Sequence, residues 1–185
     1  MKILTLRQPW AWMVVHGGKR IENRAWQPWE KVWISRGGNG RLDRIPWRGE
    51  FLIHAASGCS ESEYQNALDF AYGVPPSDRT FAIPNVETLD GPWERFIPPL
   101  EKLERGGIIG VAELVDVLPK LPEETELGWS HSWRFPGQLG WVLANVRALA
   151  FVPCKGAQGL RASNYDVWQP EGSEPIARYA PDHYP

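Results

Sequence analysis

The chain has 185 residues, of which 43% are hydrophobic and 23% charged, and this suits one globular domain better than two. Its longest apolar run, residues 10–15, is far too short to span a bilayer, which excludes a transmembrane helix. The net charge of −2 excludes a uniformly basic protein, yet residues 1–54 carry ten Lys or Arg against four Asp or Glu (+6) and residues 55–185 carry ten against eighteen (−8).

The first predicted elements are a strand, a turn and a short helix. Residues 2–6 (KILTL) are apolar and β-branched enough to form a strand. Pro9 suits the first position of a helix, and the pair Gly17-Gly18 ends it.

Two further strands are predicted next, over residues 19–26 and 31–35, with a turn at 27–30 between them. Residues 36–49 (RGGNGRLDRIPWRG) are punctuated by glycine and predict a loop. Its glycines lack the flanking strand and helix of a phosphate-binding loop, so we do not predict one there.

The middle of the chain predicts a buried strand over residues 49–56 and a helix over 60–73. Ser60 precedes that helix and Glu63 follows three residues later, which predicts a capping box. Residues 74–99 are rich in proline and show no period, and residues 98–107 predict a short helix ended by glycine.

The clearest strands are predicted late in the chain, over residues 107–118 and 139–152, which are long and rich in β-branched residues. A loop with Trp129 and Trp133 lies between them. Many strands with few, short helices exclude a doubly wound sheet and favour a compact barrel of the α+β class.

Five stretches, taken in order, resemble the ASCH domain family: LTLRQPWAWMVVHGGKRIENRAW, RGEFLIHAA, GGIIGVAELVDV, GWVLANVRAL and KGAQGL. The resemblance covers most of residues 3–161. It implies a PUA-like fold, which is a small mixed β-barrel with short helices covering its openings. The domain would span residues 1–162, with a helical and proline-rich insert at about 58–105 and an extended C-terminal tail at 163–185.

Members of this family are associated with binding of RNA or DNA, with hydrolysis of N4-acylated cytidine, or with ribonuclease activity. The resemblance therefore implies a pocket for RNA, single-stranded nucleic acid or a nucleoside-like ligand. The alternatives are a hydrolase that uses the same pocket and a protein-interaction adaptor that uses its aromatic surface.

Three residues near the N-terminus are candidates for ligand binding. Trp10 and Trp26 offer flat faces on which a base stacks, although each also fits a core position. Gln8 carries a paired donor and acceptor that can read a base edge, and it is equally able to cap the short helix.

Charged residues supply the candidate catalytic groups. Lys19, Glu22 and Arg24 are expected to converge, and an ion pair between Glu22 and Arg24 is the structural alternative. Glu113 stands in an otherwise apolar strand, so it must face a polar cavity or be paired, and Lys19 is its natural partner.

A facing lysine and glutamate can supply an acid or a base near neutral pH. The amidohydrolase relatives use a lysine, a threonine three residues later and a glutamate on a later strand. Lys19 and Glu113 match two of these, whereas Glu22 stands where the threonine would be.

Three more residues complete the candidate set. His54 fits either a proton carrier or a satisfied core histidine. Lys155 and Gln158 are flanked by glycines and suit contact with a phosphate or base, although a plain turn explains the glycines equally well. Trp141 begins an apolar strand, and we expect it in the core.

The remaining expectations concern partners and location. Cys59 and Cys154 are too few for a disulfide framework and belong to no zinc-like spacing, so we expect no metal and no cofactor. Residues 7–9 (Arg-Gln-Pro) interrupt the N-terminal apolar stretch before a signal sequence forms. We expect a cytoplasmic monomer with no membrane partner.

Overall fold

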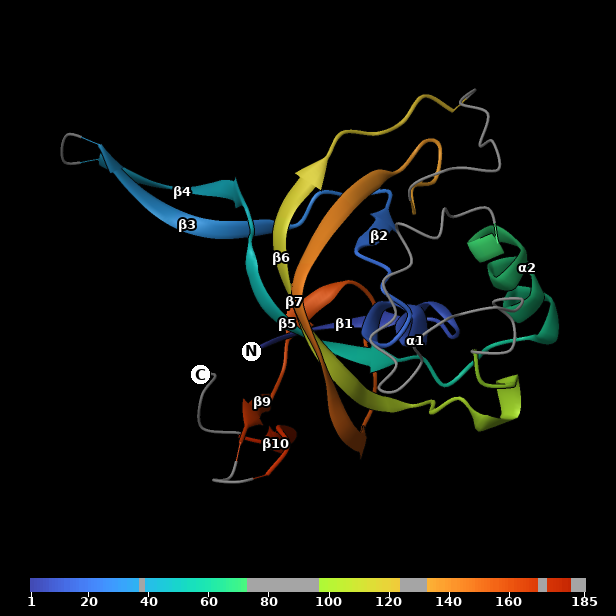
Figure 1. The fold of residues 1–185 in the computed structure, drawn as a ribbon. Coiled ribbons are helices and arrows are strands. Elements are labelled where there is room, and N and C mark those ends of the chain that lie inside the picture. The colour runs from blue at the N-terminus through green and yellow to red at the C-terminus, as the bar shows by residue number, and fades with distance from the viewer. Residues whose placement is uncertain (37–38, 73–96, 124–132, 170–172, 181–185) are drawn as a thin grey trace.

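The computed structural model describes residues 1–36, 39–72, 97–123, 133–169 and 173–180. Eight strands form one strongly curled sheet in the order β8-β1-β5-β6-β7-β10-β9, with β2 also paired to β7 (Figure 1). The strands are β1 Lys2–Leu6, β2 Ile21–Arg24, β5 Gly49–Ala55, β6 Gly107–Leu118, β7 Leu139–Pro153, β8 Leu160–Ala162, β9 Tyr165–Trp168 and β10 Ile176–Tyr179. The predicted small mixed β fold with short helices is confirmed, as a half-barrel.

The long strands β6 and β7 bend the sheet. Their pairing shifts register three times, between Ile108 and Gly110, Val111 and Glu113, and Leu114 and Asp116. Each shift puts one or two extra residues into one strand, which kinks the pair and increases its twist. The two strands agree with those predicted from their β-branched composition, but the curl comes from bulges that the pattern does not reveal.

The first helix, α1 (Trp10–Val15), follows β1 as predicted and buries Ala11, Met13 and Val14. Pro9 is its N-cap residue rather than its first helical residue. Ala11 and Val14 pack into the main core, on the face of the sheet that also carries Leu4. The alternate residue Ile3 belongs to a smaller cluster on the opposite face.

The predicted loop over residues 36–49 is wrong, because most of it is a strand. β4 (Asn39–Pro46) pairs along its length with β3 (Trp29–Arg36) in a separate two-stranded sheet. Figure 1 shows this ribbon reaching away from the body of the molecule. The sequence hides the strand because the glycines at 37, 38 and 40 and Pro46 are residues typical of loops. Gly37 and Gly38 lie outside the described residues.

The predicted capping box is confirmed at α2 (Glu61–Tyr72). The Glu63 N–H donates to Ser60 Oγ at 3.2 Å, and the Ser60 N–H donates to Glu63 Oε2 at 3.0 Å. The second predicted helix is one short 3-10 turn, η3 (Leu100–Lys102). The proline-rich stretch 74–99 lies mostly outside the described residues.

The C-terminal residues that were predicted as an extended tail include a β-hairpin. β9 and β10 pair with each other, and Ile176 of β10 lies in parallel register with Ala150 of β7. The Met1 amino group donates to Asp166 Oδ1 at 2.8 Å, which holds the hairpin against the start of the chain.

Candidate functional site

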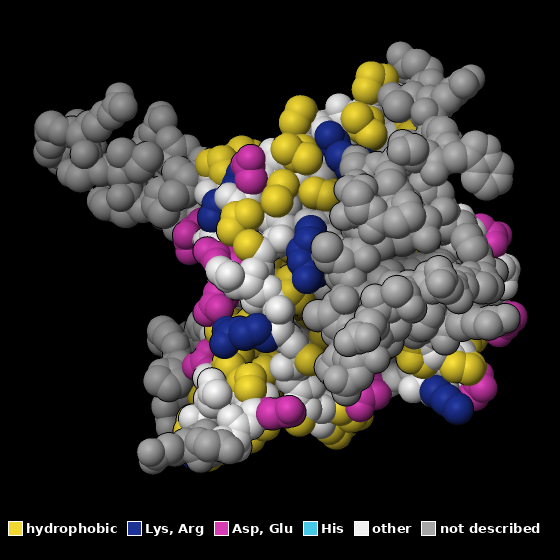
Figure 2. All heavy atoms as spheres, in the orientation of Figure 1, with side chains coloured by type: hydrophobic (Ala, Val, Ile, Leu, Met, Phe, Trp, Pro, Cys, Tyr) yellow, Lys and Arg dark blue, Asp and Glu magenta, His cyan; other side chains and the backbone are white. Residues whose placement is uncertain are grey.

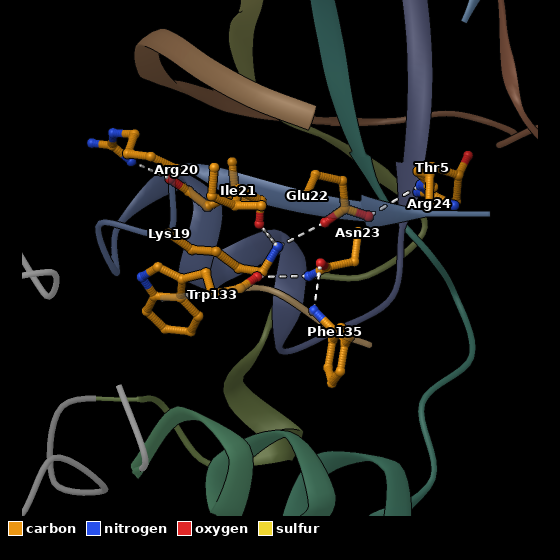
Figure 3. A network of polar contacts seen from close by, with 10 residues as sticks. Thr5, Lys19, Arg20, Ile21, Glu22, Asn23, Arg24, Trp133 and Phe135 are labelled. Carbon is orange, nitrogen blue, oxygen red and sulfur yellow. Dashed lines mark hydrogen bonds and ion pairs between the residues drawn. The ribbon is translucent and has the colours of Figure 1, made fainter. Parts of the chain in front are cut away.

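A buried lysine is the central feature of the site. Lys19 is 1% exposed, and its Nζ donates to Glu22 Oε2 at 2.9 Å and to the Ile21 carbonyl (Figure 3). Desolvation lowers the pKa of Lys19, and the neighbouring Glu22 carboxylate opposes that shift.

Two glycines bring this lysine to its place. A Cβ on Gly17 would lie 2.8 Å from the Met13 Cα, and Gly18 adopts a positive φ of 70° that a side chain would strain. The Lys19 N–H then donates to the Met13 carbonyl at 3.0 Å, so the chain leaves α1 and turns directly into β2.

The second oxygen of Glu22 faces another cation. Arg24 Nε lies 3.1 Å from Glu22 Oε1, an ion pair without hydrogen-bond geometry. Arg24 also donates to the Thr5 carbonyl on β1 at 3.1 Å. The predicted convergence of Lys19, Glu22 and Arg24 is confirmed, and it includes the ion pair that was its structural alternative.

A pocket of about 120 Å³ opens beside this network and is lined by Trp10, Lys19, Glu22, Asn23, Phe135 and Gln138. Lys19 Nζ lies 5.7 Å from the centroid of the Trp10 ring, within the range of a cation–π contact. Phe70 and Phe135 pack edge-on against the same ring at 5.7 and 5.8 Å. The tryptophan is therefore held firmly while it lines the pocket.

Asn23 fixes the opposite wall. Its Nδ2 donates to the Trp133 carbonyl and its Oδ1 accepts from the Phe135 N–H, both at 2.8 Å (Figure 3). The sequence did not point to Phe135 and Gln138, because the segment before β7 has no periodicity that would mark them. Nor did it single out Asn23, which lies in β2 between Glu22 and Arg24. Trp129, from the same predicted loop, lies outside the described residues.

Gln8 and Trp26 do not line this pocket. Gln8 is 1% exposed, its Oε1 accepts from the Trp12 N–H at 3.0 Å, and its Nε2 donates to the Glu104 carbonyl at 2.7 Å. Its amide thus caps α1 and ties it to the segment before β6. Trp26 is 37% exposed and packs edge-on against the fully buried Trp141 at 4.7 Å. The expectation of a core position for Trp141 is confirmed.

The structure does not bring Glu113 to Lys19. Glu113 Oε2 accepts from Asn145 Nδ2 at 2.7 Å, beside the register shift at which Asn145 adopts a positive φ of 49°. Strand alternation places Glu113 on the face opposite Ala112 and Leu114, which pack in the core with α1. The unusual carboxylate in this strand therefore fixes a bulge, and the partner of Lys19 is Glu22.

His54, Lys155 and Gln158 gather around another loop. His54 is buried, and its Nε2 donates to the Cys154 carbonyl at 3.1 Å. Lys155 and Gln158 are exposed and do not line the pocket of Lys19. The Ala157 N–H donates to Thr5 Oγ1 at 3.2 Å, so their loop touches the residue whose carbonyl binds Arg24.

Charges are mixed on one face of the molecule. In the face shown in Figure 2, the described Lys and Arg side chains lie among hydrophobic and acidic ones and form no uniform basic patch. Within the described ranges, no three His, Cys, Asp or Glu side chains gather as ligands of a metal ion would. The same residues contain no helix that is long and apolar enough to cross a membrane.

Comparison with known families gives one match. The profile described as the ASCH domain matches residues 4–153, which is most of the chain and includes every residue of the pocket. A search of curated proteins found no match.

The buried lysine makes stability depend on pH. Because the pKa of Lys19 is lowered from 10.5 by folding, the unfolded chain binds more protons between the lowered value and 10.5. The free energy of unfolding of the native protein, relative to Lys19→Met, should rise with pH across that window. Urea denaturation of both proteins at several pH values measures this difference, in which other titrating groups cancel. If the difference in free energy of unfolding stays flat or falls as the pH rises, the lowered pKa of Lys19 is contradicted.

Proposed function

The chain belongs to the ASCH domain family, and we propose that it binds RNA, single-stranded nucleic acid or a nucleoside by taking one base into the Trp10 pocket. The ASCH and PUA-like families are linked to RNA binding. The observation that carries the proposal is a buried Lys19 beside the Trp10 ring. A buried charge is costly to keep, and such groups concentrate at functional sites.

The size of the pocket indicates what enters it. Pockets that enclose a whole small-molecule ligand measure about 300–1,000 Å³, and this one has about 120 Å³. It therefore suits one flat group, such as a nucleobase, whose sugar and phosphate stay outside.

Gln138 takes the base-reading role that the sequence analysis gave to Gln8. Both polar groups of Gln8 are occupied, whereas the Gln138 side chain makes no hydrogen bond within the described residues. A free amide has both a donor and an acceptor for the edge of a base. Trp10 supplies the stacking surface, and Arg24, whose side chain is 23% exposed, supplies a cation next to the Lys19–Glu22 pair.

The lowered pKa of Lys19 favours a second candidate, hydrolysis of an N4-acylated cytidine. A lysine with a lowered pKa is more often neutral and can take a proton from water. The water oxygen would then bond to the acyl carbon, and Glu22, in contact with Nζ, would pass the proton to N4 of cytidine as the C–N bond breaks and the carboxylate leaves. Glu113 does not line the pocket, and its Oε2 accepts from Asn145 Nδ2, so it has no direct part in this candidate reaction.

Stacking on Trp10 predicts a specific loss of binding. Trp10→Phe keeps an aromatic side chain against Phe70 and Phe135, so we expect melting temperature to change little and affinity for oligonucleotides or nucleosides to fall several-fold. The matched control is Trp12→Phe, on the same helix but outside the pocket lining. Thermal shift and fluorescence titration measure both effects. Equal affinity in the two variants, or no binding by the native protein, contradicts the proposal.

Hydrolysis is tested separately by release of acetate from N4-acetylcytidine. If Lys19 is the base, Lys19→Met should abolish release and Glu113→Gln should leave it unchanged, because Lys19 lines the pocket and Glu113 does not. If the native protein binds nucleosides but releases no acetate, its function is restricted to binding. If Glu113→Gln releases no acetate although its stability is normal, the assignment of Lys19 as the base is overturned.

A further inference from the structure

The charged groups beside the pocket include one cation more than they include anions. Lys19 Nζ lies 2.9 Å from Glu22 Oε2, and Arg24 Nε lies 3.1 Å from Glu22 Oε1. Both oxygens of the carboxylate therefore face a cation, and the three side chains together carry a positive charge. Lys19 and Glu22 line the pocket itself. This arrangement favours a ligand that brings a partly negative atom to Lys19.

The Lys19 ammonium also has one N–H donor to spare. An ammonium group has three donors and no acceptor. Two of them are used by Glu22 Oε2 and the Ile21 carbonyl, and no third acceptor binds Nζ among the described residues. Because the side chain is 1% exposed, bulk water has little access to the remaining donor. A buried donor without a partner is costly, and a ligand that supplies an acceptor removes that cost.

The amide groups of the pocket do not change this balance. Asn23 Nδ2 donates to the Trp133 carbonyl and Asn23 Oδ1 accepts from the Phe135 N–H, so both of its polar atoms are used (Figure 3). Gln138 has no hydrogen-bond partner for its side chain among the described residues, and its amide presents a donor or an acceptor according to how it turns. The fixed polar contribution to the pocket is therefore the donor of Lys19.

The size of the pocket determines which edge of a base meets this donor. A cavity of about 120 Å³ leaves the sugar outside, so the edge opposite the sugar enters first. Lys19 Nζ lies 5.7 Å from the centroid of the Trp10 ring, and a base stacked on that ring brings an edge close to Nζ. Uracil and guanine carry a carbonyl oxygen on the edge opposite the sugar, whereas cytosine and adenine carry an amino group there.

We propose that Lys19 makes the pocket selective for bases with a carbonyl oxygen on the edge opposite the sugar, and against bases with an amino group at that position. The inference rests on the proposed function and names the class of base that the pocket accepts. A carbonyl oxygen takes the spare donor of Lys19. An amino group in the same place directs its own donors at an ammonium and leaves that ammonium without its third partner.

A series of free nucleosides tests the selectivity in the native protein. Inosine, purine riboside and adenosine share one ring system and carry a carbonyl oxygen, a hydrogen and an amino group at C6. We expect inosine to bind at least roughly fivefold more tightly than adenosine, with purine riboside between them. Uridine should exceed cytidine in the same direction. Isothermal titration calorimetry measures each affinity, and this series needs no variant that has to fold.

Two variants test whether Lys19 is the source of the selectivity. Lys19→Met removes the donor, and we expect the affinities for inosine and adenosine to come within about twofold of each other. The matched control is Arg20→Met, which removes the neighbouring cation. Arg20 donates to the Val14 carbonyl and does not line the pocket, so this variant should keep the native preference for inosine.

The outcomes separate the inference from the proposed function. If the native protein binds inosine and adenosine equally, or prefers adenosine, the selectivity is overturned while nucleoside binding stands. If Lys19→Met keeps the native preference, Lys19 is not its source and the inference is also overturned. If the native protein binds no nucleoside of the series, the proposed function fails together with the inference.

Discussion

The Glu22 carboxylate holds together the parts from which the site is built. One oxygen accepts from Lys19 and the other faces Arg24, which in turn binds the Thr5 carbonyl of β1. Without Glu22, two cations would lie side by side with little access to solvent, and breaking a buried pair of this kind costs about 3–5 kcal/mol. The same group therefore secures the attachment of β2 to β1 and the position of the lysine in the pocket.

This arrangement divides recognition between two places. Inside the pocket the charge of Lys19 is largely matched by Glu22, so we expect selectivity there to come from the ring of Trp10, from the spare N–H donor of Lys19 and from the amide of Gln138, which has no partner among the described residues. A cation that can meet phosphate lies beside it, on the partly exposed Arg24. A flat group is thus held by stacking, and the chain that bears it is held by charge.

Local features of the sequence predicted local structure well. The capping box of Ser60 and Glu63, the strands over residues 107–118 and 139–152, and the Gly17-Gly18 turn before Lys19 each depend on neighbouring residues alone. Contacts between residues far apart in the sequence could not be predicted. The Gln8 amide nitrogen donates to the carbonyl of Glu104, 96 residues away, and the Glu113 carboxylate accepts from Asn145 at a bulge that the periodicity of the strand does not predict. Strand β4 was missed because the glycines at 37, 38 and 40 and Pro46 gave its stretch of sequence the composition of a loop.

The indole N–H resonances of the eleven tryptophans give the most direct test of the central claim, that a base enters the pocket beside Lys19. On titration with a short single-stranded RNA, the account predicts that the Trp10 resonance shifts, together with the backbone amides of Phe135 and Gln138. The resonance of Trp168, on the C-terminal hairpin, should stay in place. Shifts confined to Trp168 and its surroundings, with Trp10 unchanged at saturation, would contradict the account.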